Sequence, residues 1–256
     1  MADVIQVAPE FDGWFPRDGR RSIEAMAQLA RLDVRKHRKR SLVSACTLRD
    51  AEGKPLEVYF KAYARRRHLF DGFARQSLGR VEARNLENFG QLGIRTPKVV
   101  AWGARRSLAG LASELSFLIT QAVPESLALR DYWAGLDLPL DPVLRQKVID
   151  ELATQTRKLH AARFFHQDLK WRNLLVDGDT NVWWIDCPNG YTSGLAPRQR
   201  HGRIKDLATL DIVAKERCTE QERLRFVQVY LNEMKVTNNV KSWSKRVVRY
   251  RERRFD

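Results

Sequence analysis

Residues 166–176 of the chain read HQDLKWRNLLV, and the apolar stretch 183–185 that follows them ends in Asp186. Asp168 and Asn173 therefore stand just before one predicted strand, and a second apolar strand carries Asp186 at its end. We expect these three polar side chains to converge in the folded chain, and this arrangement decides the fold and the chemistry considered below.

Transfer of a phosphoryl group to a hydroxyl needs a carboxylate that orients the hydroxyl and accepts its proton. It also needs oxygen ligands that hold Mg²⁺ on the phosphates. Asp168 suits the first task, and Asn173 and Asp186 suit the second. Lys170 can neutralise charge on the transferring group. Four polar residues at these offsets arise by chance in roughly one such chain in several hundred; they are His166, Asp168, Asn173 and Asp186. This low frequency disfavours the alternative that they are ordinary polar residues that cap turns.

The charge balance points to an anionic partner. The 256 residues include 46 Lys and Arg against 31 Asp and Glu, a formal net charge of +15. Such an excess favours nucleic acid, an acidic lipid surface or a phosphorylated substrate. Solubility alone is the competing explanation, although smaller charges suffice for it.

Composition places the protein among reduced, globular proteins. Hydrophobic residues make up 43% of the chain, which excludes a disordered chain. Cys46, Cys187 and Cys218 have no paired or metal-like spacing, so we expect reduced thiols and a cytoplasmic location. The first residues lack a signal-peptide pattern, and no apolar run is long enough to span a membrane. Attachment to a membrane surface stays open.

The first half predicts a small lobe built on an antiparallel sheet. Residues 42–48 and 56–63 read as a hairpin, and 78–92 has helical periodicity before Gly93. Two more strands are predicted near 97–102 and 115–121. Strands on both sides of one helix indicate an α+β lobe.

The second half is predicted to be mainly helical. Asp141-Pro142 begins one helix, and Thr219 with Glu222 forms a capping box that begins another. The apolar residues expected to face inward from this second helix are Leu224, Val227, Leu231 and Met234. We therefore expect an N-terminal β-rich lobe over 1–121 and a helical lobe over 122–256.

The pattern HxDLxxxN, then an apolar strand and Asp186, resembles the catalytic and metal-binding loops of the protein-kinase-like fold. The resemblance implies a bilobal α+β protein that uses ATP and Mg²⁺. It places Lys61 as the ATP-binding lysine and Glu82 as its ion-pair partner, with Glu87 as a competitor. Gln121 and Val123 correspond to the hinge, whose backbone groups bind adenine.

The resemblance extends to the segment RIKDL at 203–207. There Asp206 corresponds to a buried carboxylate that holds the catalytic loop through backbone hydrogen bonds. An exposed helix N-cap is the alternative for Asp206. His166 is expected to be a structural hydrogen-bonding residue and not a chemical participant.

Departures from the kinase pattern are informative. The first hairpin lacks G-x-G-x-x-G, so the phosphates must be covered by other amides, for which residues 41–44 are candidates. Gln167 replaces the usual arginine before the catalytic aspartate, and Cys187-Pro188 follows Asp186. These features favour a constitutive small-substrate kinase over a regulated protein kinase.

Five segments narrow the resemblance to bacterial lipopolysaccharide core kinases of the WaaP/InaA type. They are YFK at 59–61, GRVEAR at 79–84, LGIRTP at 92–97, HQDLKWRN at 166–173 and RIKDL at 203–207. This family implies phosphorylation of heptose or Kdo in the inner core at the cytoplasmic face of the inner membrane. The implied partner is an anionic glycolipid, and nucleic acid is not expected.

Basic segments agree with an anionic acceptor. The run at 65–68 and the tail at 241–254 could each attract an acidic surface. The tail mixes basic residues with Trp243, Val247, Val248 and Tyr250, as interfacial helices do. An ordinary terminal helix with a solvated basic face is the equal alternative.

Three other functions fit the same pattern. Aminoglycoside or choline phosphotransferases take cationic acceptors, which the net charge of +15 disfavours. A RIO-like protein kinase acting near RNA would explain the charge. A non-catalytic binding module that kept the fold is the third. The sequence does not indicate an oligomeric state.

Overall fold

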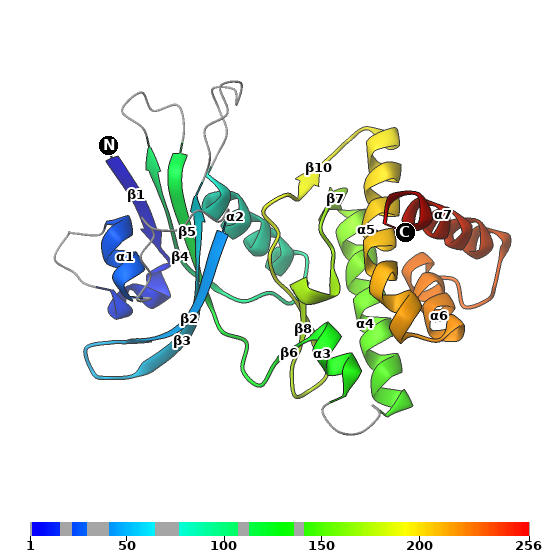
Figure 1. The fold of residues 1–256 in the computed structure, drawn as a ribbon, viewed down its shortest axis with the longest axis horizontal. Coiled ribbons are helices and arrows are strands. Elements are labelled where there is room, and N and C mark those ends of the chain that lie inside the picture. Colours follow the sequence, from blue (N-terminus) through cyan, green and yellow to red (C-terminus); the bar gives the residue numbers. More distant parts are fainter. Residues whose placement is uncertain are drawn as a thin grey trace. The chain divides into compact units, whose positions relative to one another are not determined.

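The computed structural model describes residues 2–15, 22–29, 41–64, 77–106, 113–135 and 141–255 (Figure 1). The chain divides into two compact units. The first comprises Met1–Glu87 and Pro97–Ala122, and the second comprises Asn88–Thr96 and Val123–Asp256. The loop around Gly93 thus groups with the second unit, whereas the division expected from the sequence gave all of 1–121 to the first.

The first unit is built on a five-stranded antiparallel sheet of order β1-β4-β5-β3-β2. Its strands are β1 (Ala2–Val7), β2 (Ser41–Arg49), β3 (Pro55–Ala64), β4 (Val99–Arg106) and β5 (Ser113–Gln121). The last four confirm predicted strands. β1 was not predicted, and it pairs with β4 at one edge of the sheet.

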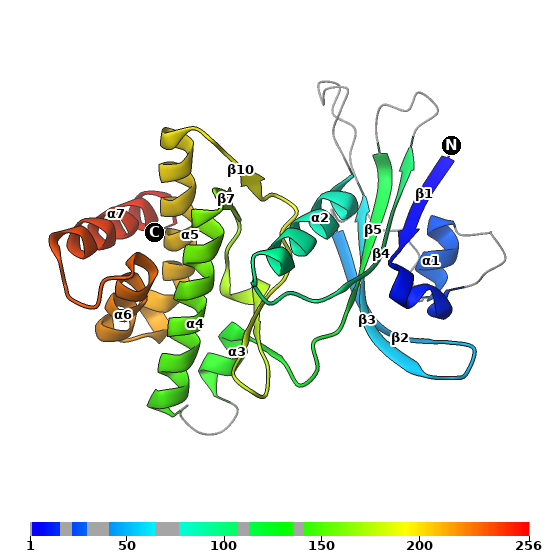
Figure 2. The ribbon, with the colours of Figure 1, turned by 180° about the vertical axis from the view of Figure 1, so that it is seen from behind.

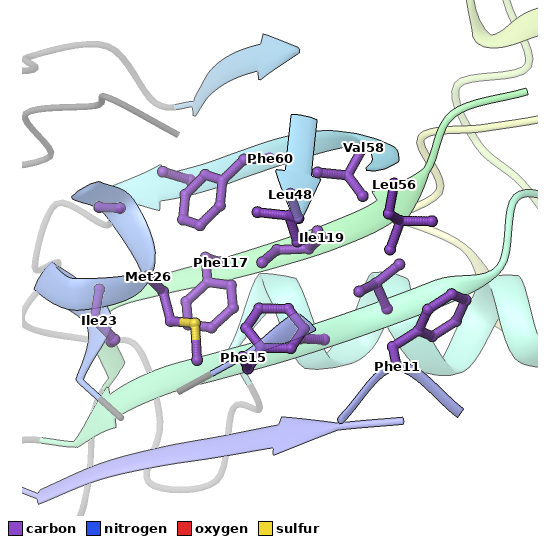
Figure 3. Packing of buried hydrophobic residues seen from close by; sticks show 14 residues of the cluster. Phe11, Phe15, Ile23, Met26, Leu48, Leu56, Val58, Phe60, Phe117 and Ile119 are labelled. Atoms are coloured by element: carbon purple, nitrogen blue, oxygen red, sulfur yellow. The ribbon is translucent and has the colours of Figure 1, made fainter. Parts of the chain in front are cut away.

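Alternation along β3 separates a buried core from a polar face. Val58 and Phe60 enter the core, where Phe60 stacks on Phe117 of β5 with 5.3 Å between ring centroids (Figure 3). The 3₁₀ turn η1 (Pro9–Trp14) and helix α1 (Ile23–Leu29) cover this core. Lys61 belongs to the other set of alternating residues and so projects from the opposite face.

Helix α2 (Leu78–Gln91) lies across that opposite face, and Figures 1 and 2 show α1 and α2 on the two sides of the sheet. Its first turn approaches β5 closely. A Cβ atom at Gly79 would lie 2.3 Å from the carbonyl oxygen of Phe117. Only glycine fits this approach, which places the next turn of α2 beside β3.

Besides the end of α2, the described residues of the second unit form the helices α3 (Leu129–Ala134), α4 (Pro142–Ala161), α5 (Ala196–Arg217), α6 (Glu220–Leu231) and α7 (Asn238–Arg254). Short strands complete it: β6 (Leu127–Ala128) with β8 (Leu174–Val176) and β9 (Val182–Trp184), and β7 (Phe164–Phe165) with β10 (Tyr191–Thr192). The Asp141 cap and the Thr219–Glu222 capping box are confirmed. An antiparallel-sheet unit and a mainly helical unit confirm the predicted α+β class.

Two details concern the helix packing expected from the sequence. Met234 does not face inward, because α6 ends at Leu231, where Asn232 adopts a left-handed φ of 60°, and Met234 is 68% exposed. The tail forms α7, whose Val247 is buried and whose Trp243 packs against the same cluster. This apolar side is therefore used for packing within the unit, which agrees with the ordinary terminal helix, one of the two alternatives that the sequence left open.

A buried ion pair network holds the last three helices together. Asp211 of α5 accepts hydrogen bonds from Arg223 of α6 at 2.7 and 2.9 Å and from Arg251 of α7 at 2.5 Å. In the part of the chain that the structure describes, no helix is long and apolar enough to cross a membrane.

Candidate active site

In the first unit, Lys61 and Glu82 form a buried ion pair. The Nζ atom of Lys61 lies 3.3 and 3.2 Å from the two carboxylate oxygens of Glu82, and the Glu82 side chain is only 3% exposed. Glu87, the competing partner, is exposed one to two turns further along α2. An ion pair as buried as this one adds little net stability.

In the second unit, Asp206 fixes the backbone of the loop before Asp168. Its side chain is fully buried in α5 and accepts hydrogen bonds from the N–H groups of His166 and Gln167, both at 2.7 Å. The ring of His160 lies 3.2 Å from the same carboxylate. Asp206 is therefore the buried anchor and not an exposed N-cap. Bonds from backbone N–H groups to a buried carboxylate are among the stronger hydrogen bonds.

Left-handed backbone marks two positions around this loop. Gln167 has a φ of 71° and Asp186 a φ of 61°. Each non-glycine residue in this region costs roughly 1–2 kcal/mol, so the surrounding hydrogen bonds must hold it there. At Gln167 that bond is the one to Asp206, and Lys205 Nζ also lies 3.0 Å from the Gln167 amide oxygen.

The Asp168 carboxylate is held by two cations and stays open on one side. Its Oδ1 lies 2.6 Å from Lys170 Nζ, and its Oδ2 lies 3.7 Å from a guanidinium nitrogen of Arg172. The Asp168 side chain is 30% exposed, so its carboxylate is accessible from solvent. Sequence reasoning singled out Lys170 but missed Arg172, although the spacing of four residues from Asp168 was visible.

Asn173 and Asp186 are brought to the same loop. The Asn173 amide nitrogen donates to the Asp168 carbonyl at 2.8 Å, and the N–H of Ile185, next to Asp186, donates to the Asn173 carbonyl at 2.9 Å. The structure thus gathers Asp168, Asn173 and Asp186 within the second unit. Asp168 and Asn173 lie in the segment before β8, and Asp186 follows β9.

The donor set fits Mg²⁺. The Asn173 amide nitrogen donates to the Asp168 carbonyl, so the amide oxygen is the atom of this side chain that would bind a metal ion. An amide oxygen and a carboxylate are hard ligands suited to Mg²⁺, which completes its shell with water and phosphate oxygens. Among the described residues, no three His, Cys, Asp or Glu side chains gather into a self-sufficient metal site.

His166 has the structural surroundings expected of it. It is 1% exposed and lies between the rings of Phe89 and Trp184, at 6.1 and 5.9 Å between centroids. Burial lowers the pKa of its imidazole, the nearby carboxylates acting in the opposite direction. The ring is therefore neutral near pH 7 and acts as a packing and hydrogen-bonding group.

The predicted hinge residues belong to different units. The N–H of Gln121 donates to the Lys98 carbonyl at 2.9 Å, and the N–H of Ala122 donates to the Glu57 carbonyl at 2.8 Å. In the second unit, the Val123 carbonyl accepts from Ser126 Oγ at 2.8 Å. The N–H groups of Gln121 and Ala122 are thus committed to the first unit and are not available to a ligand.

Two other predicted features concern phosphates and charge. Residues 41–44 lie in β2, an edge strand that pairs only with β3 among the described strands. Alternate amides on its open edge therefore remain candidates for phosphate contacts. The basic run 65–68 lies outside the described residues.

With this geometry in view, comparison with known families is decisive. The model of the lipopolysaccharide kinase (Kdo/WaaP) family matches residues 55–230, well over half of the chain. The chain belongs to this family. No curated protein matches it. The resemblance drawn from the sequence is confirmed at family level.

The lipopolysaccharide kinase (Kdo/WaaP) family is a family of phosphotransferases whose substrates are related to lipopolysaccharide. The matched range runs from β3, which carries Lys61, to α6 and so contains every candidate site residue. It leaves β1, η1, α1, β2 and α7 outside.

Proposed function

We propose that the protein transfers the γ-phosphoryl group of ATP to a hydroxyl of heptose or Kdo in the lipopolysaccharide inner core. The reaction would take place at the cytoplasmic face of the inner membrane. The observation that carries this proposal is the Asp168–Asn173–Asp186 cluster on a loop anchored by Asp206, within a chain of this kinase family.

The predicted site residues match the tasks that phosphoryl transfer requires. From the first unit, Lys61 held by Glu82 would bind the α- and β-phosphates, and the Gln121 carbonyl would accept from adenine. The Val123 N–H, in the second unit, would donate to adenine. Asn173 and Asp186 would hold Mg²⁺, which neutralises charge on the phosphates when bound.

The acceptor chemistry belongs to Asp168 and its cations. The carboxylate of Asp168 would orient the sugar hydroxyl and accept its proton as the new phosphorus–oxygen bond forms. Lys170, 2.6 Å away, would move its charge toward the transferring group. Arg172 lies at the exposed side of the same carboxylate and is suited to an anionic acceptor.

The test uses purified protein, radiolabelled ATP, Mg²⁺ and lipopolysaccharide precursor extracted from cells that lack this protein. Label should appear in the glycolipid, and mass spectrometry of the released core should place the new phosphate on heptose or Kdo. Asp168→Asn should lower kcat about 10²- to 10⁴-fold while leaving the thermal unfolding midpoint unchanged.

The matched control is Asp179→Asn, which alters an exposed carboxylate of the same unit and should retain activity. Retained turnover in Asp168→Asn would remove Asp168 from its role. Label on protein and none on glycolipid would favour the RIO-like alternative. No transfer to any acceptor would favour a non-catalytic module.

A further inference from the structure

Two helix ends in the second unit carry many cations and few anions. Residues 196–205 at the start of α5 include four Lys or Arg and His201 with no acid, and α7 has seven Lys or Arg against Glu252 alone. The exposed arginines among them are Arg198, Arg200, Arg249, Arg253 and Arg254. We call these five residues the basic surface. Cations with so few neighbouring anions favour a polyanionic partner.

A chain of rings joins the two helix ends into one surface. The His201 ring of α5 lies 5.7 Å from the Tyr250 ring of α7, and Tyr250 lies 6.4 Å from Phe255. Figures 1 and 2 both show the C-terminal end of α7 lying against α5. Arg200 and His201 also line an open hollow with Ala196, Pro197 and Ile204.

Exposed apolar side chains accompany the arginines. Leu195, the N-cap residue of α5, is 63% exposed, and Phe255, just after α7, is 44% exposed. Neither contributes to the buried cluster that Val247 and Tyr230 form beneath α7. Binding to phosphates alone does not require exposed apolar groups, whereas interfacial segments pair them with Lys and Arg at the headgroup boundary. The combination favours a lipid surface over nucleic acid.

We propose that the basic surface, with Leu195 and Phe255, docks the protein on membranes that contain anionic phospholipid. Arginines would contact headgroup phosphates, and the two apolar side chains would enter the headgroup boundary. The apolar side of α7 stays packed on α5 and α6, so docking needs no rearrangement of the helix.

The same surface continues toward the reaction site. Lys205, on the third turn of α5, lies 3.0 Å from the side chain of Gln167, the residue before Asp168. If the proposed function holds, docking would therefore hold the catalytic loop close to the membrane that presents the glycolipid acceptor. Only this consequence rests on the proposed function; the docking itself does not.

The experiment measures cosedimentation of the full-length protein with vesicles, without ATP or acceptor. Vesicles of phosphatidylcholine with about one-third phosphatidylglycerol are compared with phosphatidylcholine alone at ~0.1 M salt, where surface charges still act over about 10 Å. The test variant is Arg200→Glu/Arg253→Glu/Arg254→Glu. Its control is Arg130→Glu/Lys158→Glu/Arg217→Glu, which changes the net charge equally at exposed positions elsewhere in the unit.

Binding should require phosphatidylglycerol and should fall at least about 100-fold in the test variant, because each cation contributes about five-fold. The control should keep most of the affinity. Leu195→Ser/Phe255→Ser should leave binding more sensitive to salt. Equal losses in test and control variants, or equal binding to both vesicles, would overturn the proposal. The proposal would also be overturned if the protein did not bind vesicles but bound a single-stranded RNA oligonucleotide through these arginines.

The vesicle result is independent of catalysis. Asp168→Asn, which removes the proposed base, should bind vesicles as the unmodified protein does. Loss of vesicle binding in the basic-surface variant with intact transfer to detergent-dispersed acceptor would support docking alone. If the unmodified protein binds vesicles but transfers no phosphate to the acceptor, that result would instead count against the proposed function.

Discussion

Asp206 shows how one buried side chain can fix the backbone of a loop that belongs to another segment of the chain. Its two oxygens accept the N–H groups of His166 and Gln167, and Gln167 is thereby held in left-handed backbone next to Asp168. Asp206 is thus a positioning residue. Its effect on activity must pass through the loop that carries Asp168.

Asp206→Asn should therefore weaken both stability and turnover. An asparagine can accept only one of the two N–H groups, and its NH₂ would face the other. We expect a loss of about 2 kcal/mol in the free energy of unfolding and a fall in kcat of about 10- to 100-fold. The KM for ATP should change little, since Lys61 and Glu82 are untouched. Urea denaturation and steady-state kinetics measure these quantities.

Asp150→Asn is the matched control, because Asp150 forms a half-exposed pair with Arg225 at 2.8 Å. Such pairs contribute at most about 1 kcal/mol, and kcat should be unchanged. A folded Asp206→Asn protein with normal kcat would show that the loop keeps its conformation without this anchor.

Some residues could be predicted from the sequence and others could not. Asp168, Asn173 and Asp186 stand in a short motif whose spacing implies convergence, so their gathering was predictable. The burial of Asp206 was expected only through the family resemblance, because a helix N-cap and a buried anchor look alike in a single sequence. The contact between Arg172 and Asp168 depends on the 3₁₀ turn Trp171–Asn173, whose geometry the sequence does not specify.

At the level of elements, β1 is held in the first unit by an ion pair as well as by backbone hydrogen bonds to β4. Asp3 accepts from Arg105 of β4 at 2.8 and 3.0 Å and from the N–H of Ile23 at the start of α1 at 3.0 Å. Arg105 also pairs with Glu24. One carboxylate thus joins β1, β4 and α1.

This contact should make stability depend on pH in a defined direction. The Arg105 hydrogen bond lowers the pKa of Asp3 below the ordinary value of an aspartate, although burial opposes the shift. The unfolded chain therefore takes up the proton first. The contribution is complete above about pH 4 and is lost as pH falls through the lower, folded pKa.

Asp3→Asn should consequently lower the free energy of unfolding by about 1–2 kcal/mol at pH 6, and by less at pH 3. Urea denaturation at the two pH values tests this. Glu52→Gln, at an exposed turn position, should show the same small difference at both. An Asp3→Asn penalty that does not shrink in acid would contradict the ion pair.

Elements with local signals were predictable. Caps at Asp141 and Thr219 and alternation in β3 depend on neighbouring residues. β1 was not predictable, because the hydrogen bond from Arg105 to Asp3 that holds it joins residues 102 positions apart. The end of α6 was misjudged because apolar periodicity continues to Met234, whereas left-handed Asn232 ends the helix.

For the whole molecule, bound nucleotide and metal should be visible as thermal stabilisation. A ligand at 100 times its Kd stabilises the folded state by about 2.7 kcal/mol. For a protein of this size that raises Tm by about 5–10 °C. We expect such a shift with ATP and Mg²⁺ together, and a much smaller one with ATP and EDTA.

Asp186→Asn is the sharpest variant for this measurement, because asparagine tolerates left-handed backbone and only the charge is lost. Its Tm without ligand should match that of the unmodified protein, and its shift with ATP and Mg²⁺ should fall to the EDTA level. Asp179→Asn should shift normally. A full shift in Asp186→Asn would remove Asp186 from the metal site.

Trp184 gives the protein a built-in optical reporter. Its indole is fully buried, packs edge-on to Phe89 and lies beside His166, and Trp184 stands two residues before Asp186 in the chain. Its fluorescence should therefore be blue-shifted and sensitive to any change in the loop below it. Ligand titrations can follow this signal without dyes or labels, with Trp184→Phe as the blank.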